Sequence, residues 1–171
     1  MHSQSARDVY YRFTLHYKKE NLVVESNLGD FFITFAPGTQ DIPLTERVRR
    51  INAHCNTLGK SNVILISIHV NAAGNGTKWL NATGWSCYTS KGQTQSDKLA
   101  ECLYEAAIKN FPGKRVRTDK SDGDPDWEES FYSLRKTLCP AVLTENFFMD
   151  NHSDLEYLQS RAGKQAIVDP T

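Results

Sequence analysis

Residues 62–72 read NVILISIHVNA, and this stretch decides the fold of the chain. Its core, VILI at residues 63–66, is continuously apolar and mostly β-branched, which is typical of a strand that is covered on both faces inside a sheet. We therefore predict an interior strand over residues 63–69. Ligands of open α/β sheets bind outside the carboxyl ends of strands, so His69, at the end of this strand, is the first candidate functional residue.

A helix is predicted immediately before this strand. Apolar residues recur at helical spacing between residues 43 and 58, and Gly59 occupies the position of a helix C-cap. The members of this apolar stripe are Leu44, Val48, Ile51, Cys55 and Leu58. Arg47, Arg49 and Arg50 lie on the same helix, and we expect them to form a solvated face with one inward member.

The segments after the first predicted strand alternate between strand-like and helix-like patterns. Residues 84–90, GWSCYTS, predict a second strand. Thr94 and Asp97 form a capping-box pattern, which predicts the start of a second amphipathic helix. Residues 140–145, PAVLTE, predict a short apolar strand that ends at Glu145.

A closing helix is predicted by another capping-box pattern, in which Ser153 is followed by Glu156. A polar loop rich in Asp occupies residues 117–130. Alternating helices and buried strands predict an α/β fold, a single domain with a mainly parallel sheet and helices on both faces. We expect residues 63–69 and 141–145 to be neighbouring or near-neighbouring interior strands, with their carboxyl ends together.

Composition bounds the kind of protein. The chain has 171 residues, with 20 basic and 20 acidic side chains, a length that suits one domain. The neutral charge balance argues against nucleic acid as a partner. No apolar run approaches the ~20 residues of a membrane span, and the first residues carry no signal-peptide core. We expect a monomer without a transmembrane segment.

The N-terminal segment follows a different pattern from the rest. We expect residues 1–40 to be irregular or diverged, and residues 41–171 to form the catalytic core. No glycine-rich turn between a strand and a helix precedes Asp41, so no phosphate-binding loop is predicted. His16 and Glu20 stand four residues apart, which would place them on one face of a helix as a possible metal-binding pair.

His69 and Glu145 end the two most apolar strands, and they suggest a chemistry together. An imidazole and a carboxylate at neighbouring strand ends can act as a metal ligand and a general base. The structural alternative is a hydrogen-bonded core histidine beside a glutamate that serves as an ion-pair partner or a helix cap. Spacing alone leaves both alternatives open.

Three motifs resemble those of one enzyme family. Residues 66–76, ISIHVNAAGNG, resemble the SIHxNA signature of zinc-dependent N-acetylmuramoyl-L-alanine amidases of the LytC/AmiC type, amidase family 3. Residues 140–151, PAVLTENFFMDN, resemble their second signature, and residues 41–56 resemble the Arg-bearing helix before the first. The resemblance covers residues 41–168 in the family's order.

The resemblance implies a doubly wound α/β fold that holds one zinc ion. It makes His69 a zinc ligand and Glu145 the catalytic base, and Asn71 a residue that bonds the substrate or supports the loop of the ligand. The implied activity is that of a cell-wall hydrolase, an amidase that cuts peptidoglycan between the lactyl group of N-acetylmuramic acid and L-alanine. The substrate implies a bacterial or phage protein that is periplasmic, secreted or released by a phage.

The family's other two zinc ligands have no secure counterpart in the sequence. Its first motif, a strand followed by a glycine-rich turn such as GHGG, does not occur. Asp8, His16 and Glu20 are the candidates for completing the site, and we expect weak zinc binding and low activity. Two alternatives are a zinc peptidase, which usually carries an HxxE pair that this chain lacks, and a non-catalytic peptidoglycan-binding or inactive relative.

Overall fold

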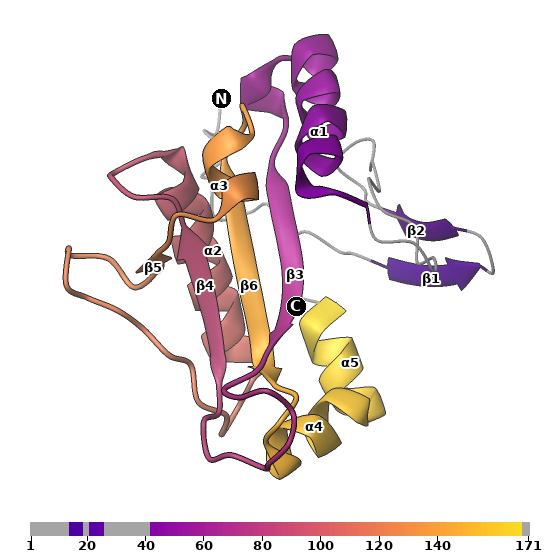
Figure 1. Cartoon of the computed structure of the whole chain (residues 1–171), viewed down its shortest axis with the longest axis vertical. Coiled ribbons are helices and arrows are strands. Elements are labelled where there is room, and N and C mark those ends of the chain that lie inside the picture. Colours follow the sequence, from indigo (N-terminus) through magenta and orange to yellow (C-terminus); the bar gives the residue numbers. More distant parts are fainter. Residues whose placement is uncertain (1–13, 19–20, 26–41, 169–171) are drawn as a thin grey trace, which may run out of the picture.

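A four-stranded sheet forms the centre of the computed structural model, which describes residues 14–18, 21–25 and 42–168 (Figure 1). The strand order is β3-β6-β4-β5, with bounds Leu65–Asn71, Ala141–Phe148, Trp85–Thr89 and Trp127–Glu128. β3 pairs with β6 in parallel, β4 pairs with β5 in parallel, and β4 pairs with β6 antiparallel. The prediction of an α/β fold with a mainly parallel sheet is confirmed, although β4 makes the sheet mixed.

The described N-terminal residues form a hairpin of two antiparallel strands, β1 (Thr14–Lys18) and β2 (Asn21–Glu25). His16 pairs with Val23 in this hairpin. The hypothesis that His16 and Glu20 share a helix face is therefore wrong, because His16 lies in a strand. Glu20 and Asp8 lie outside the described residues.

Helices cover both faces of the sheet, as predicted (Figure 1). α1 (Leu44–Leu58) and α3 (Tyr132–Lys136) lie over one face, and a 3-10 turn, η2 (Lys60–Asn62), leads from α1 into β3. α2 (Gln95–Asn110), α4 (His152–Gln159) and α5 (Arg161–Val168) lie over the other. No helix within the described ranges is long and apolar enough to cross a membrane.

The main core lies between the sheet and α2. Its buried members come from β4, β6 and α2 and from the residue that follows α2; they are Trp85, Cys87, Ala100, Tyr104, Ala107, Phe111, Val142 and Phe147. Aromatic rings meet edge to face inside it, as between Trp85 and Tyr104, whose centroids are 5.0 Å apart. Burial of this apolar surface, at about 25 cal/mol per Å², holds α2 to the sheet.

The opposite face carries two smaller apolar clusters. Ile51 and Cys55 of α1 pack with Cys139. Leu134 of α3 packs on Leu143 of β6, with Leu65 and Tyr88 alongside. Because residues two apart in a strand share a face, these contacts also fix which side of the sheet each later residue of β3, β4 and β6 occupies.

The helix starts agree only in part with the capping patterns. Thr94 and Asp97 form the predicted capping box of α2. The predicted second capping box is wrong, because Asn151 caps α4 and accepts a hydrogen bond from the Asp154 amide at 3.1 Å. The predicted closing helix is also broken into α4 and α5 at Ser160, whose backbone is extended.

The first strand differs most from its prediction. β3 begins at Leu65 rather than at residue 63, and it is the outermost of the four described strands on its side of the sheet. The exposed fractions of Ile64, Ile68 and Val70 are 45%, 62% and 39%. The expectation of an interior strand covered on both faces is therefore wrong for the described part of the chain. An apolar run does not reveal whether other segments of the chain pack over the strand.

Asp154 joins three segments at the base of the fold. It is 2% exposed, and its carboxylate accepts hydrogen bonds from the Thr83 hydroxyl at 2.7 Å and from the Gly84 and Phe148 amides, both at 3.1 Å. The start of α4, the start of β4 and the end of β6 thus meet at one side chain.

We expect Asp154→Ala to lower the free energy of unfolding by about 3 kcal/mol, because buried donors left without an acceptor cost roughly 1–3 kcal/mol. Urea denaturation measures this. Asp122→Ala, a change at an exposed aspartate, is the matched control and should leave the free energy of unfolding nearly unchanged. Equal stability of the two variants would contradict this role of Asp154.

Candidate functional site

His69 and Glu145 lie opposite each other on neighbouring strands. In the parallel pairing of β3 and β6 they are direct register partners. β3 continues past His69 to Asn71 and β6 continues past Glu145 to Phe148, so the predicted end of the second strand at Glu145 is wrong. Both residues nevertheless lie in the carboxyl-terminal halves of their strands, toward the end where ligands of open α/β sheets bind. The prediction that these two strands are neighbours with their carboxyl ends together is confirmed.

The two side chains also share a face of the sheet. Leu65, Ser67 and His69 alternate along β3, and Leu65 packs on the face covered by α1 and α3. Leu143 packs on the same face, so Glu145, two residues later, does too. The Ser67 hydroxyl lies 2.9 Å from Nε2 of His69, which fixes the orientation of the imidazole.

The surroundings of His69 favour the neutral form of its imidazole. It is accessible to solvent, but partial burial of the ring lowers its pKa, and the positive charge of Arg47 lowers the pKa further. A neutral imidazole has a lone pair for a metal, whereas a protonated one does not.

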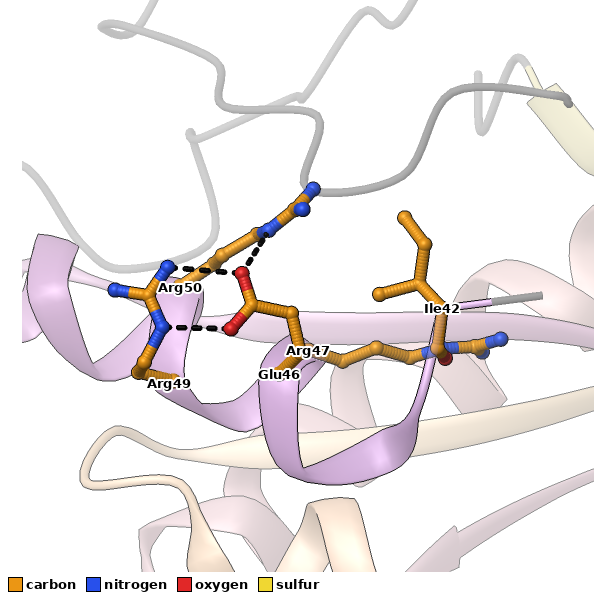
Figure 2. Close-up of polar contacts among 5 residues, drawn as sticks. All are labelled: Ile42, Glu46, Arg47, Arg49 and Arg50. Atoms are coloured by element: carbon orange, nitrogen blue, oxygen red, sulfur yellow. Dashed lines mark hydrogen bonds and ion pairs between the residues drawn. The ribbon is translucent and has the colours of Figure 1, made fainter. Parts of the chain in front are cut away.

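α1 separates its three arginines into two groups (Figure 2). Arg49 and Arg50 converge on Glu46, with Nε–carboxylate distances of 2.6 and 2.8 Å. Hydrogen bonds from Arg49 and Arg50 lower the pKa of Glu46 to about 2, and the bond from Arg49 has the larger effect. Arg47 extends in the other direction, and its Nε donates to the Ile42 carbonyl at 2.7 Å. Arg47 is thus set apart from the other two arginines of this helix.

Glu145 is partly withdrawn from water. Its Oε2 is buried and has no hydrogen-bond partner in the described part of the chain. Burial raises the pKa of the carboxyl. A carboxylate with a raised pKa is suited to accept a proton.

Asn146, the next residue, ties the two strands together at this level. Its Nδ2 donates to the His69 carbonyl at 2.9 Å, and its Oδ1 accepts from Nε1 of Trp85 at 2.9 Å. It is 3% exposed. The motif ENFF contained this residue, but only the paired strands reveal that it braces the backbone of His69.

Phe147 gives β6 a sharp change of direction directly after the site. Its backbone φ angle is +65°, which residues other than glycine rarely adopt. The register between β3 and β6 shifts at the same level, between His69 and Asn71. This irregularity lets Glu145 face one side of the sheet while Phe147 fills the core on the other.

The segment after β3 is anchored to the end of β6. The carbonyl of Asn71 accepts from the Met149 amide at 2.8 Å, and its side-chain oxygen accepts from the Ala72 amide at 2.8 Å. Asp150 accepts from the amides of Ala73 and Gly74, and these bonds lower its pKa. Asn71 therefore sits in a braced turn beside His69, and its side-chain oxygen is used within that turn.

A family model described as N-acetylmuramoyl-L-alanine amidase matches residues 22–170. The chain belongs to this family. It is 33% identical over 129 residues to the N-acetylmuramoyl-L-alanine amidase CwlM of Bacillus licheniformis, covering 75% of this chain and 43% of that protein. It is 32% identical over 118 residues to an endolysin of Bacillus phage SPP1, covering 68% and 38%. The chain thus spans about two fifths of the length of the curated relatives it matches.

A solved structure of the family has the same fold. The N-acetylmuramoyl-L-alanine amidase of Clostridium difficile 630 superposes with a TM-score of 0.58 at 25% identity, covering 75% of this chain and 63% of that one. The family resemblance of the sequence motifs is therefore confirmed by both sequence and fold.

Within the described ranges of this amidase-family chain, one group of three potential metal ligands occurs, and it lies elsewhere. Ligand atoms of Asp97, Asp124 and Asp126 lie within 4.8 Å of one another. The carboxylate of Asp126 accepts a hydrogen bond of 2.5 Å from the hydroxyl of Thr89, the last residue of β4. β4 runs antiparallel to β6, so this group is near the opposite end of the sheet from Glu145. The Asp-rich loop was visible in the sequence, but its convergence with the start of α2 was not.

The acidic group makes folding depend on pH. Burial, with a smaller contribution from the neighbouring Asp124, raises the pKa of Asp126 to about 7 against the opposing hydrogen bond from Thr89. An unfolded aspartate titrates near 3.9. Between these values the folded state keeps a proton that the unfolded state has lost, so this contribution to stability falls as pH rises from about 4 to about 7.

We therefore expect Asp126→Asn to gain stability relative to wild type as pH rises from 5 to 8. Thermal unfolding across this pH range measures the difference in Tm. Asp119→Asn, in the same loop, is the control. If wild type and Asp126→Asn keep a constant difference in Tm at every pH, Asp126 does not retain its proton in the folded state.

Proposed function

We propose that this chain is a peptidoglycan amidase that hydrolyses the amide bond between the lactyl group of N-acetylmuramic acid and L-alanine. The observation that carries the proposal is the direct pairing of His69 with Glu145 on one face of the sheet. Membership of the amidase family supports the same conclusion. The alternative of a non-catalytic relative is less favoured, because the matching family model and the curated relative CwlM are both described as N-acetylmuramoyl-L-alanine amidases.

Glu145 is the proposed general base. Its carboxylate, whose pKa is raised by burial, can accept a proton from a water molecule that attacks the scissile carbonyl. The raised pKa then lets the protonated carboxyl hand this proton to the departing amine of L-alanine. Both transfers require the water and the amine to lie within hydrogen-bond reach of this one carboxyl group. A position toward the carboxyl-terminal end of β6 permits this.

His69 is the proposed zinc ligand. Its neutral, solvent-accessible imidazole suits this role, and the Ser67 hydroxyl orients the ring. When bound, zinc lowers the pKa of a bound water to about 7 and polarises the substrate carbonyl. We further propose that Asn71 supports the turn beside His69 or bonds the substrate there.

The described residues supply only one ligand by motif, whereas a catalytic zinc normally has three protein ligands and a water. We therefore expect the isolated 171-residue chain to bind zinc weakly. Metal analysis after purification without chelators, followed by zinc titration, measures this. One tightly held zinc per chain would contradict the expectation and show that Asp8, His16, Glu20 or another residue completes the site.

The decisive test of the proposed activity uses purified peptidoglycan with the zinc-saturated chain. We expect new free amino groups that belong to L-alanine, without new reducing sugar ends. Binding to peptidoglycan without release of these amino groups would favour the non-catalytic alternative.

The substrate places the proposed action outside the inner membrane, in the periplasm or at the cell wall. Light scattering should show a monomer.

A further inference from the structure

A third polar residue lies in line with His69 and Glu145. Ser86 of β4 is the register partner of Glu145 in the antiparallel pairing of β4 with β6. Tyr88, two residues later on β4, packs on the face that Leu143 and Leu65 occupy, so Ser86 shares that face. Ser86, Glu145 and His69 thus form a row across three adjacent strands.

Two members of this row have unmet hydrogen-bonding capacity. Ser86 is 0% exposed, and its hydroxyl has no partner within the described residues. The buried Oε2 of Glu145 has none either. A buried polar atom without a partner costs roughly 1–3 kcal/mol, so two such atoms on directly opposite residues call for a shared explanation.

We propose that Ser86 is a positioning residue for Glu145, whose carboxylate it holds by donating a hydrogen bond from its hydroxyl, directly or through one water. Side chains directly opposite in an antiparallel pair have Cβ atoms about 5 Å apart, so rotation of these two side chains suffices to bring donor and acceptor together. One orphaned donor and one orphaned acceptor are then satisfied by the same bond.

This bond would leave the second carboxylate oxygen of Glu145 for the reacting water. A hydroxyl that fixes one oxygen removes rotational freedom from the other, and a fixed base reacts more often from the productive orientation. The consequence for catalysis rests on the proposed amidase function; the hydrogen bond itself does not.

Trp127 offers the competing donor. Its Nε1 is also buried without a partner in the described part of the chain, and its strand β5 pairs with β4 at Tyr88. Trp127 is one strand farther from Glu145 than Ser86 is, so Ser86 is the favoured donor. Trp127→Phe removes this N–H while keeping most of the ring.

The kinetic test compares Ser86→Ala, Ser86→Cys and Ser86→Thr on peptidoglycan. We expect Ala and Cys, which lack a good donor, to lower kcat by about 10- to 100-fold with little change in KM, as for other residues that orient a catalytic group. Thr keeps the hydroxyl and should restore most of kcat. Ser96→Ala is the matched control: Ser96 is 7% exposed and accepts from the Ala141 amide at 3.0 Å, and its loss should lower stability without changing kcat.

A spectroscopic test does not depend on turnover. The infrared carboxylate band of Glu145, isolated as the difference between wild type and Glu145→Gln in glutamate-labelled protein, reports hydrogen bonds to that group. We expect the band to shift in Ser86→Ala and Ser86→Cys and to stay in place in Ser86→Thr, Trp127→Phe and Ser96→Ala.

An unchanged band in Ser86→Ala, or an equal shift in Trp127→Phe, would overturn the inference. If wild type fails to release L-alanine amino groups while the band still responds to Ser86, the proposed function fails and the hydrogen bond stands. We expect the Ser86 variants to fold, because at this buried position Ala is smaller than Ser and Cys is only slightly larger.

Discussion

Glu145→Gln is expected to slow hydrolysis of peptidoglycan by roughly 10²- to 10⁴-fold, the usual contribution of a general base. Glutamine has nearly the shape of glutamate but cannot take a proton from water at neutral pH. The change removes the proposed base while leaving His69 and its orientation by Ser67 intact. Release of L-alanine amino groups measures the rate, and zinc titration should give the same affinity as wild type.

A matched variant separates this effect from a general loss of charge. Glu156 lies on α4 and is exposed, and Glu156→Gln should keep full activity. If Glu145→Gln retained wild-type activity, the role assigned to Glu145 would be wrong. If it lost zinc as well as activity, Glu145 would be a ligand rather than the base.

Phe147→Ala is expected to lower the free energy of unfolding by about 3–5 kcal/mol, the usual cost of removing a fully buried phenylalanine. Phe147 is 0% exposed. Its ring meets Phe111 and Tyr157 edge to face, with both centroid distances at 5.1 Å. Its removal leaves a cavity between β6, the end of α2 and α4, and the total stability of a small domain is only about 5–15 kcal/mol.

Chemical denaturation measures this loss. Phe131→Ala is the control, since Phe131 is 37% exposed and should cost about 1 kcal/mol or less. A similar loss in both variants would show that Phe147 does not fill the core as described.

The sequence predicted the strands that carry the site because their apolar runs and polar ends are local signals. Residues 140–145 predict a strand whose start matches that of β6, and His69 and Glu145 are register partners, although β3 continues to Asn71 and β6 to Phe148. The capping box at Thr94 was equally local, since Thr94 and Asp97 satisfy each other's neighbouring backbone groups without any tertiary contact.

The errors arose where the outcome depends on distant contacts. The apolar run of β3 does not reveal that Ile68 is 62% exposed, because cover comes from other segments. The break at Ser160 and the cap at Asn151 depend on how the chain leaves β6. Ser86 lay in a predicted strand, but only the pairing of β4 with β6 places it opposite Glu145.

The two strands of the site differ in how firmly they are held. β6 has hydrogen-bonded neighbours on both sides, β3 and β4, whereas β3 pairs with β6 alone among the described strands. Backbone amides exchange with solvent as fast as their surroundings open, so those of β6 should be among the last to take up deuterium, and the outer amides of β3 should exchange earlier. We therefore expect Glu145 to lie on the strand of this sheet that opens most slowly, and His69 on a strand that opens more readily.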